Sequence, residues 1–299
     1  MSLSAHDIRN TAERDAAHLP GLLLRAQHLA NGVLLGEHGR RRPGSGDDFW
    51  QYRPLYDGES HRMIDWRQSA RGDDHFVRQH EMKNAQTAQL WVDQGASMRF
   101  TGHAERVTKS DRARIIALSL SILLLRNGER VGLSDGTLAP RRGGQQVEHL
   151  SHRLETDQTQ DYAAPETGAL MPNARVVFIS DFMAPVEPVK TAVGRATDRN
   201  ATGVLLQVLD PIELQFPFTG RTIFESIGGK LRHESLKASD LKAGYLERLE
   251  IRRASLRDLC QQTGWQYHCH MTDRAAQSAL LWLYHALGEG AQRAGASRV

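Results

Sequence analysis

The sequence has few cysteines and no long apolar run. Only Cys260 and Cys269 occur among 299 residues, so we expect no disulfide framework and a reducing compartment. The most apolar stretch, ALSLSILLL at 117–125, carries two serines and is much shorter than the roughly 20 residues that cross a bilayer. This stretch predicts a core helix, and no membrane span is expected.

Targeting signals and common catalytic motifs are also missing. The first twenty residues contain acids and no apolar core, unlike a secretory signal or a transit peptide, so a cytoplasmic location is expected. There is no Gly-x-Ser-x-Gly elbow, Walker loop, dinucleotide glycine fingerprint or His-Glu-x-x-His motif. The net charge of +3 is too small to indicate nucleic-acid binding without a concentrated basic face.

An alternation of apolar strands and amphipathic helices runs through residues 87–288. The predicted strands are 87–93, 130–134, 174–180, 203–209 and 265–270, and the predicted helices are 108–127, 145–156, 186–198, 238–262 and 274–288. This order predicts an α/β, Rossmann-like fold with a mostly parallel sheet flanked by helices. The segment at 219–235 alternates around a Gly-Gly pair and predicts a small antiparallel hairpin.

The first 86 residues differ in kind, with one predicted helix near 20–35 followed by a long charged segment. That segment has too few apolar residues for a core of its own, so we expect an irregular arm packed on the α/β domain. The expected anchors are Phe49, Trp50, Tyr52, Tyr56, Ile64 and Trp66. The predicted organisation is therefore an N-terminal part (1–86), an α/β domain (87–288) and a flexible tail (289–299).

Two predicted strands end on an aspartate. Asp93 follows the strand in AQLWV, and Asp181 follows the strand in ARVVFIS. In open α/β sheets, ligands bind beyond the carboxyl ends of the strands, so the two carboxylates and the Ser97 hydroxyl are expected to converge. Oxygen ligands of this kind suit Mg²⁺, which makes Asp93, Ser97 and Asp181 the candidate metal ligands.

The loop Asp93-Gln94-Gly95-Ala96-Ser97 resembles the Asp-x-Ser-x-Ser metal-ion-dependent adhesion site of the von Willebrand factor type A fold. In addition, YRPLYDGESHRMIDWRQSAR at 52–71 resembles the long signature of the bacterial domain of unknown function 58 family, and VVFISDF and VLDPIELQFPFTG resemble its later segments. The resemblance to this family implies association with MoxR-type AAA+ ATPases. It also implies a von Willebrand factor A-like fold.

The chain departs from the adhesion-site pattern at two positions. Gly95 replaces the first hydroxyl, and the loop expected to offer a threonine has Gly143, Gly144 and Gln145. Only a weak, mostly hydrated Mg²⁺ is expected, which Gly95→Ser should strengthen, and a partner carboxylate could complete the shell. The alternative is that Asp93 and Asp181 cap helices or accept backbone N–H bonds.

The signature segment carries charges of alternating sign. Its candidate partner-binding residues are Arg53, Asp57, Arg62, Asp65, Trp66 and Arg71. One interpretation is an ion-pair lattice that pins the arm, with Trp66 filling a groove, so that Trp66→Ala should destabilise the protein by about 3–5 kcal/mol. The other is a docking surface in which arginines grip carboxylates.

Three functions remain open from the sequence. The first is a non-enzymatic adaptor that binds a MoxR-type AAA+ ATPase or its client protein through the sheet edge and the arm. The second is a metal-dependent hydrolase that uses Asp93, although Gly95 stands where a phosphotransfer site usually has a second carboxylate. The third, suggested only by the pI near 9, is a nucleic-acid-binding module.

Overall fold

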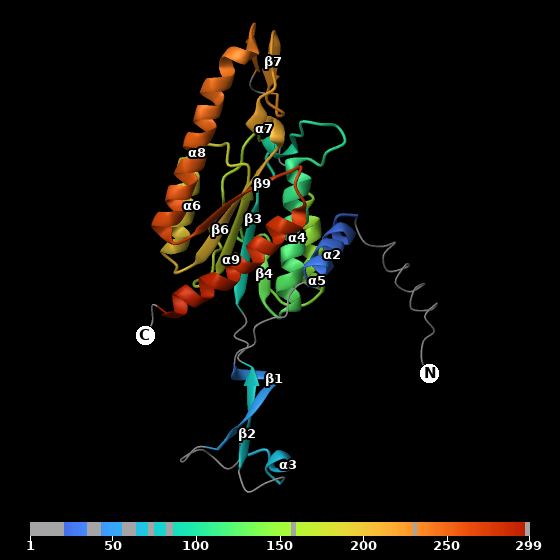
Figure 1. Cartoon of the computed structure of the whole chain (residues 1–299), viewed down its shortest axis with the longest axis vertical. Helices are drawn as coiled ribbons and strands as arrows, with labels where there is room; N and C mark the ends of the chain where they lie inside the picture. The colour runs from blue at the N-terminus through green and yellow to red at the C-terminus, as the bar shows by residue number, and fades with distance from the viewer. Residues whose placement is uncertain are drawn as a thin grey trace, which may run out of the picture. The chain divides into compact units, whose positions relative to one another are not determined.

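The computed structural model describes residues 21–34, 43–55, 64–70, 75–81, 86–156, 160–229 and 232–296. These residues belong to two compact units. One unit holds residues 21–34 and 86–296, and the other lies within Gly36–Ala85 (Figure 1).

The larger unit is built on a five-stranded sheet. Its strands are β3 (Thr87–Val92), β4 (Arg130–Leu133), β5 (Arg175–Ser180), β6 (Thr202–Leu209) and β9 (Gln266–Met271). The strand order is β4-β3-β5-β6-β9, and every neighbouring pair is parallel. The inner strands are buried on both faces, which explains their nearly continuous apolar sequences. The predicted α/β fold with a mostly parallel sheet flanked by helices is therefore confirmed.

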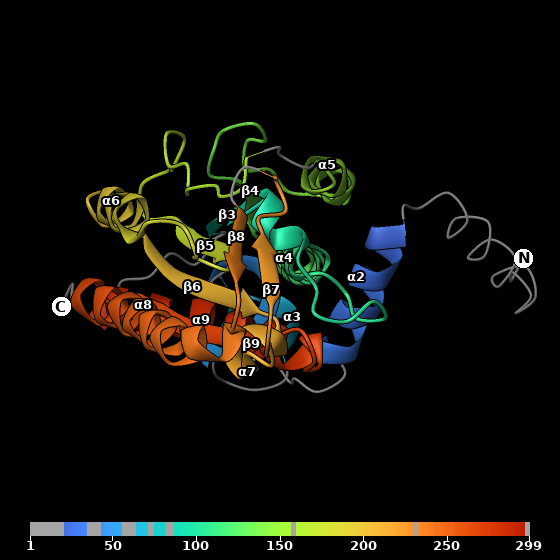
Figure 2. The same cartoon turned by 90° about the horizontal axis from the view of Figure 1, so that it is seen from above.

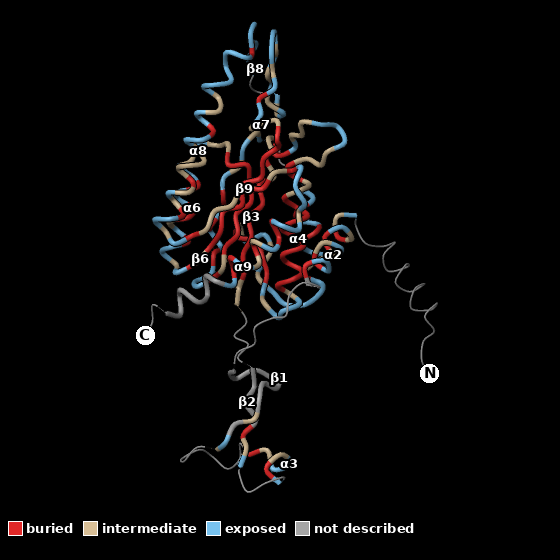
Figure 3. Tube along the Cα trace, in the orientation of Figure 1, coloured by how far each residue is buried: buried red, intermediate tan, exposed pale blue. Residues whose placement is uncertain are grey.

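Two helical layers cover the sheet, as the view from above shows (Figure 2). The long helices of this unit are α2 (Gly21–Leu34), α4 (Lys109–Arg126), α5 (Gln145–Leu154), α6 (Val186–Thr197), α8 (Lys242–Thr263) and α9 (Ala276–Ala296). Side chains alternate along each strand, so Val177 and Ile179 join the core with α2, α4, α5 and α9. Val176 and Phe178 join the opposite core with α6 and α8. The strands of the sheet are coloured as buried along most of their length in Figure 3.

The N-terminal helix belongs to the α/β unit. Ala26 and Ala30 of α2 are fully buried, and Leu23 and Val33 lie in the same core cluster as α4. This spacing forms one apolar face, which a helix must cover with another element. The predicted grouping of this helix with the charged segment in a domain 1–86 is therefore corrected.

The C-terminal helix is longer than predicted. A flexible tail was predicted at 289–299, but α9 continues to Ala296. Alanine, glutamine and arginine in this segment favour helix and outweigh the glycines that suggested fraying. Residues 297–299 lie outside the described residues.

The smaller unit is more regular than the predicted irregular arm. Strand β1 (Pro43–Pro54) pairs antiparallel with β2 (Phe76–Glu81), and the short helix α3 (Trp66–Ser69) precedes β2. Ile64 is buried and forms a bridge with Val77 within this unit. The packing of this unit on the α/β unit stays a prediction.

A second hairpin lies beyond the carboxyl end of β6 (Figure 1). The short helix α7 (Pro211–Gln215) follows β6 directly, and β7 (Thr222–Glu225) pairs antiparallel with β8 (Arg232–Ser235). The predicted hairpin at 219–235 is confirmed. Its position places the hairpin at the same edge of the sheet as the acidic strand ends.

Candidate functional site

The two acidic strand ends lie side by side. Asp93 follows β3 and Asp181 follows β5, and these strands are neighbours in the sheet. The Asp93 backbone N–H donates to the Ile179 carbonyl at 2.8 Å, which extends the pairing to the end of the strands. The predicted convergence of the two carboxylates at one sheet edge is confirmed.

Asp93 is held inside the protein. Its side chain is 2% exposed, and its Oδ1 accepts from the Gly95 N–H at 2.8 Å while Oδ2 accepts from the Ser180 hydroxyl at 2.6 Å. Burial, together with the neighbouring Asp181 charge, raises the pKa of Asp93 to about 6. These contacts match the alternative in which the carboxylate accepts hydrogen bonds from the loop that follows it.

Gly95 is required by the packing of this loop. A Cβ at this position would lie 2.9 Å from Asp93 Oδ1 and 3.0 Å from the Asp161 carbonyl oxygen. Gly95→Ser would therefore add more than a hydroxyl, because the Asp93 carboxylate or the loop would have to shift. Its expected effect on metal binding stays a prediction.

A lysine that the sequence analysis did not single out lies at the centre of the edge. The Lys109 ammonium donates to Asp181 Oδ2 at 2.8 Å and to Glu213 Oε1 at 2.7 Å, and its side chain is only 2% exposed. Burial alone would lower the pKa of Lys109, but the charges of Asp181 and Glu213 outweigh it and raise that pKa. Burial raises the pKa of Glu213, and Lys109 partly opposes this.

The placement of Lys109 in its helix was a signal that could have identified it. Thr108 caps α4 by accepting from the Asp111 N–H at 3.0 Å, so Lys109 is the first helical residue. A cation is unfavourable at a helix N-terminus, where the helix dipole favours acids. A buried lysine at such a position therefore requires carboxylates from elsewhere in the fold.

A small cavity opens beside this lysine. Its volume is about 150 Å³, and Ser97, Lys109, Asp181 and Glu213 are among the residues that line it. Within the part of the chain that the structure describes, the Ser97 hydroxyl is buried and has no hydrogen-bond partner. Ser97 and Asp181 thus share a cavity, whereas Asp93 is not among its lining residues.

The residues of this edge do not fit a divalent cation. The free Ser97 hydroxyl could serve as a ligand, but Asp181 Oδ1 accepts from the Met183 N–H at 3.0 Å and Oδ2 holds Lys109. Both oxygens of Asp93 are also engaged. Mg²⁺ needs about six oxygens in near-octahedral geometry, and an ammonium group stands among those available. The weak Mg²⁺ site stays a prediction that only a titration can test.

A third acidic strand end, Asp210, was also missed. It follows β6 and accepts from Arg106 Nη1 at 3.1 Å, from the Thr272 hydroxyl at 3.0 Å and from the Ile212 N–H at 2.9 Å. Burial acts to raise the pKa of Asp210, but these hydrogen bonds outweigh it and lower the pKa. Asp210 forms a capping box with Glu213, which fixes Glu213 beside Lys109.

The candidate docking residues of the signature are only partly described. Asp65 caps α3 by accepting from the Gln68 N–H at 3.1 Å. Within its own unit Trp66 is 60% exposed and makes an edge contact with the His75 ring at 5.7 Å. The prediction that it fills a groove against the α/β unit stays a prediction. The side chain of Arg53 and the residues Asp57, Arg62 and Arg71 lie outside the described residues.

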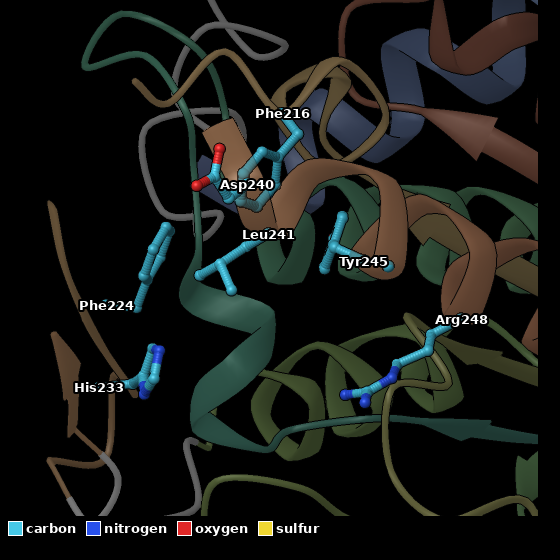
Figure 4. A pocket seen from close by; sticks show the side chains of 8 residues that line it. Phe216, Phe224, His233, Asp240, Leu241, Tyr245 and Arg248 are labelled. Atoms are coloured by element: carbon cyan, nitrogen blue, oxygen red, sulfur yellow. The ribbon is translucent and has the colours of Figure 1, made fainter. Parts of the chain in front are cut away.

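An aromatic pocket lies between α7, the hairpin and the start of α8 (Figure 4). Its volume is about 640 Å³, and Phe216, Phe224, Leu241 and Tyr245 form much of its wall. The Phe216 and Phe224 rings stack at 5.8 Å, and Phe216 lies 5.0 Å from Tyr245. The sequence signal for this pocket was the cluster of phenylalanines in QFPFTGRTIF, whose first part carried only the family resemblance and whose second part predicted only the hairpin.

The fold and the edge define an α/β protein with a parallel sheet whose neighbouring strands end on buried acids. Residues 51–233 match the family model described as "Protein of unknown function DUF58". The chain therefore belongs to the DUF58 family.

The chain is also similar to other proteins of known sequence and to solved structures. Uncharacterised proteins of Mycobacterium tuberculosis and Mycobacterium bovis are 29% identical over 226 residues, which cover 70% of this chain and 70% of each relative. The crystal structure of the conserved hypothetical protein BatB from Bacteroides thetaiotaomicron matches 69% of this chain and 100% of that chain, with 10% identity and a TM-score of 0.40. Among the described residues, no helix combines the length and apolar character needed to cross a bilayer.

Proposed function

We propose that this DUF58 protein is a non-enzymatic protein-binding module that docks a partner at the carboxyl edge of its sheet. In line with the family resemblance, the proposed partner is a MoxR-type AAA+ ATPase or its client protein. The observation that carries the proposal is a set of exposed apolar side chains on and beside the β7–β8 hairpin, next to the aromatic pocket.

Three of these side chains are unusually open to solvent. Leu236 is 80% exposed, Ile223 is 47% exposed and Ile227 is 43% exposed. Burying apolar surface favours association, and exposed apolar groups that gather in one region often mark interaction sites. The pocket beside them offers aromatic walls of the kind that receive anchoring side chains.

The surroundings of Asp93 favour a binding role over hydrolysis. A nucleophile or base must reach its substrate, but Asp93 is 2% exposed and both of its oxygens accept hydrogen bonds. No observation in the described structure favours the alternatives of a metal-dependent hydrolase or a nucleic-acid-binding module. The proposal of a non-enzymatic module rests on the burial of Asp93 and on the exposed apolar side chains of the hairpin.

Biolayer interferometry with a purified cognate MoxR-type ATPase tests the proposal. Leu236→Asp should weaken binding by about tenfold or more, because it places a charge in the centre of the proposed contact. Ile251→Asp on α8 is the matched control, since Ile251 is 63% exposed but lies outside the hairpin and the pocket. Equal binding by parent, Leu236→Asp and Ile251→Asp would refute docking at the hairpin. Absence of binding by the parent would refute this partner.

A further inference from the structure

A buried lysine stands where the resemblance to the von Willebrand factor type A fold implies a divalent cation. The Lys109 ammonium donates to Asp181 Oδ2 at 2.8 Å and to Glu213 Oε1 at 2.7 Å. We infer that this ammonium is the permanent cation of the sheet edge and that the edge works without a divalent metal ion. The inference concerns the isolated chain and does not depend on the proposed partner.

The distance between Lys109 and Asp181 makes the lysine and a metal ion mutually exclusive. Mg²⁺ binds carboxylate oxygens at about 2.0–2.1 Å. With Nζ at 2.8 Å from Asp181 Oδ2, an ion on that oxygen would lie at most about 5 Å from Nζ. Two cations this close repel strongly in a buried site, where charges are weakly screened. A divalent ion could therefore bind Asp181 Oδ2 directly only if Lys109 left.

Several contacts hold Lys109 in place. Its backbone N–H donates to the Phe100 carbonyl at 3.2 Å, and its ammonium lies 5.5 Å from the centre of the Phe100 ring. Its helix begins at the Thr108 cap. Because the ammonium is attached to a fixed backbone, it competes with a free ion as an intramolecular group with a high effective concentration.

The neighbouring loop is closed to an additional metal ligand. A side chain at Gly95 would collide with Asp93 Oδ1 and approach the Asp161 carbonyl oxygen. A serine of the adhesion-type pattern could stand here only if the Asp93 carboxylate or the loop shifted. The missing ligand and the buried lysine are thus two parts of one arrangement, in which an internal cation balances the strand-end carboxylates.

Isothermal titration calorimetry of the full chain tests the inference directly. We expect no saturable heat from Mg²⁺ or Ca²⁺ up to about 10 mM, because binding would have to expel Lys109. Saturable binding of either ion by the parent chain, lost in Asp181→Asn, would overturn the inference. This measurement needs no variant of Lys109.

Replacing the lysine should create the metal site. In Lys109→Ala, Asp181 and Glu213 keep oxygens 2.8 and 2.7 Å from the vacated position, close to the 2.3–2.6 Å of Ca²⁺–oxygen contacts. We expect about 2 mM Ca²⁺ to raise the melting temperature of Lys109→Ala by roughly 5 °C. Adding Asp181→Asn to this variant should abolish the shift.

Lys190→Ala is the matched control, because the Lys190 ammonium also lies 2.8 Å from a carboxylate, that of Glu187, but its side chain is 43% exposed. The melting temperature of this control, like that of the parent, should not respond to Ca²⁺. A folded Lys109→Ala that shows no response to Ca²⁺ or Mg²⁺ would overturn the inference. If the Lys109 variant folds only with divalent ions, its refolding yield can be compared between Ca²⁺ and Na⁺ at equal ionic strength. A higher yield with Ca²⁺ would support the inference, and equal yields would overturn the inference.

Discussion

At the residue scale, Asp93 shows how burial makes a carboxyl group sensitive to pH. Its pKa of about 6 lies above the ordinary value of 3.8, chiefly because the group is buried. A raised pKa means that the folded state holds the proton more tightly than the unfolded state. The contribution of Asp93 to stability is therefore fully present below about pH 4 and is lost as the pH rises through about 6.

We predict that the free energy of unfolding of the parent, relative to Asp93→Asn, increases as the pH falls from 7 to 4. A shift of about two pKa units corresponds to an upper value of roughly 3 kcal/mol. Urea unfolding of both proteins at several pH values measures the difference, and the comparison cancels the other titrating groups. A difference that does not change with pH would show that Asp93 titrates normally.

Trp66 and Trp265 give a second residue-scale test. Trp66 is 60% exposed, so Trp66→Ala should change the free energy of unfolding by less than about 1 kcal/mol. Trp265 is 4% exposed and lies 5.4 Å from the Phe178 ring, so Trp265→Ala should cost about 3–5 kcal/mol. Urea unfolding monitored by circular dichroism compares the two. Similar losses in both variants would mean that Trp66 is buried in solution.

At the scale of elements, the start of α4 positions the central lysine. Thr108 accepts from the Asp111 N–H at 3.0 Å, and its replacement by alanine should lower the free energy of unfolding by about 1 kcal/mol. Thr197→Ala is the control, because the Thr197 hydroxyl only donates back to the Val193 carbonyl inside α6. Equal melting temperatures of Thr108→Ala and Thr197→Ala would contradict the capping role.

The elements themselves were largely predictable from sequence because their signals are local. The five strands of the sheet and its flanking helices occur where apolar runs and helical periodicity placed them. The pairing of Lys109 with Asp181 was not predictable, since 72 residues separate them in the chain. Helix α2 was predicted, but its apolar face does not reveal which unit will cover it.

At the scale of the whole molecule, the division into two units makes a prediction about truncation. A chain beginning at Gln86 would lack α2, whose Ala26 and Ala30 are buried in the main core. We expect this truncation to melt at a lower temperature than a chain in which only Gly36–Ala85 is replaced by a flexible linker. Circular dichroism melts compare them. Identical melts would show that α2 does not stabilise the α/β unit.

The buried pairing of Lys109 also bears on the order of events in folding. The lysine meets one carboxylate 72 residues away and another 104 residues away, so three distant segments must be in place before the ammonium loses its water. Contacts that close such long loops form late, because the entropy of closure precedes any gain. A group that is paired only after the transition state influences the unfolding rate and hardly changes the folding rate. The pairing of Lys109 therefore slows unfolding. Removal of this lysine should shorten the lifetime of the folded chain far more than it slows refolding.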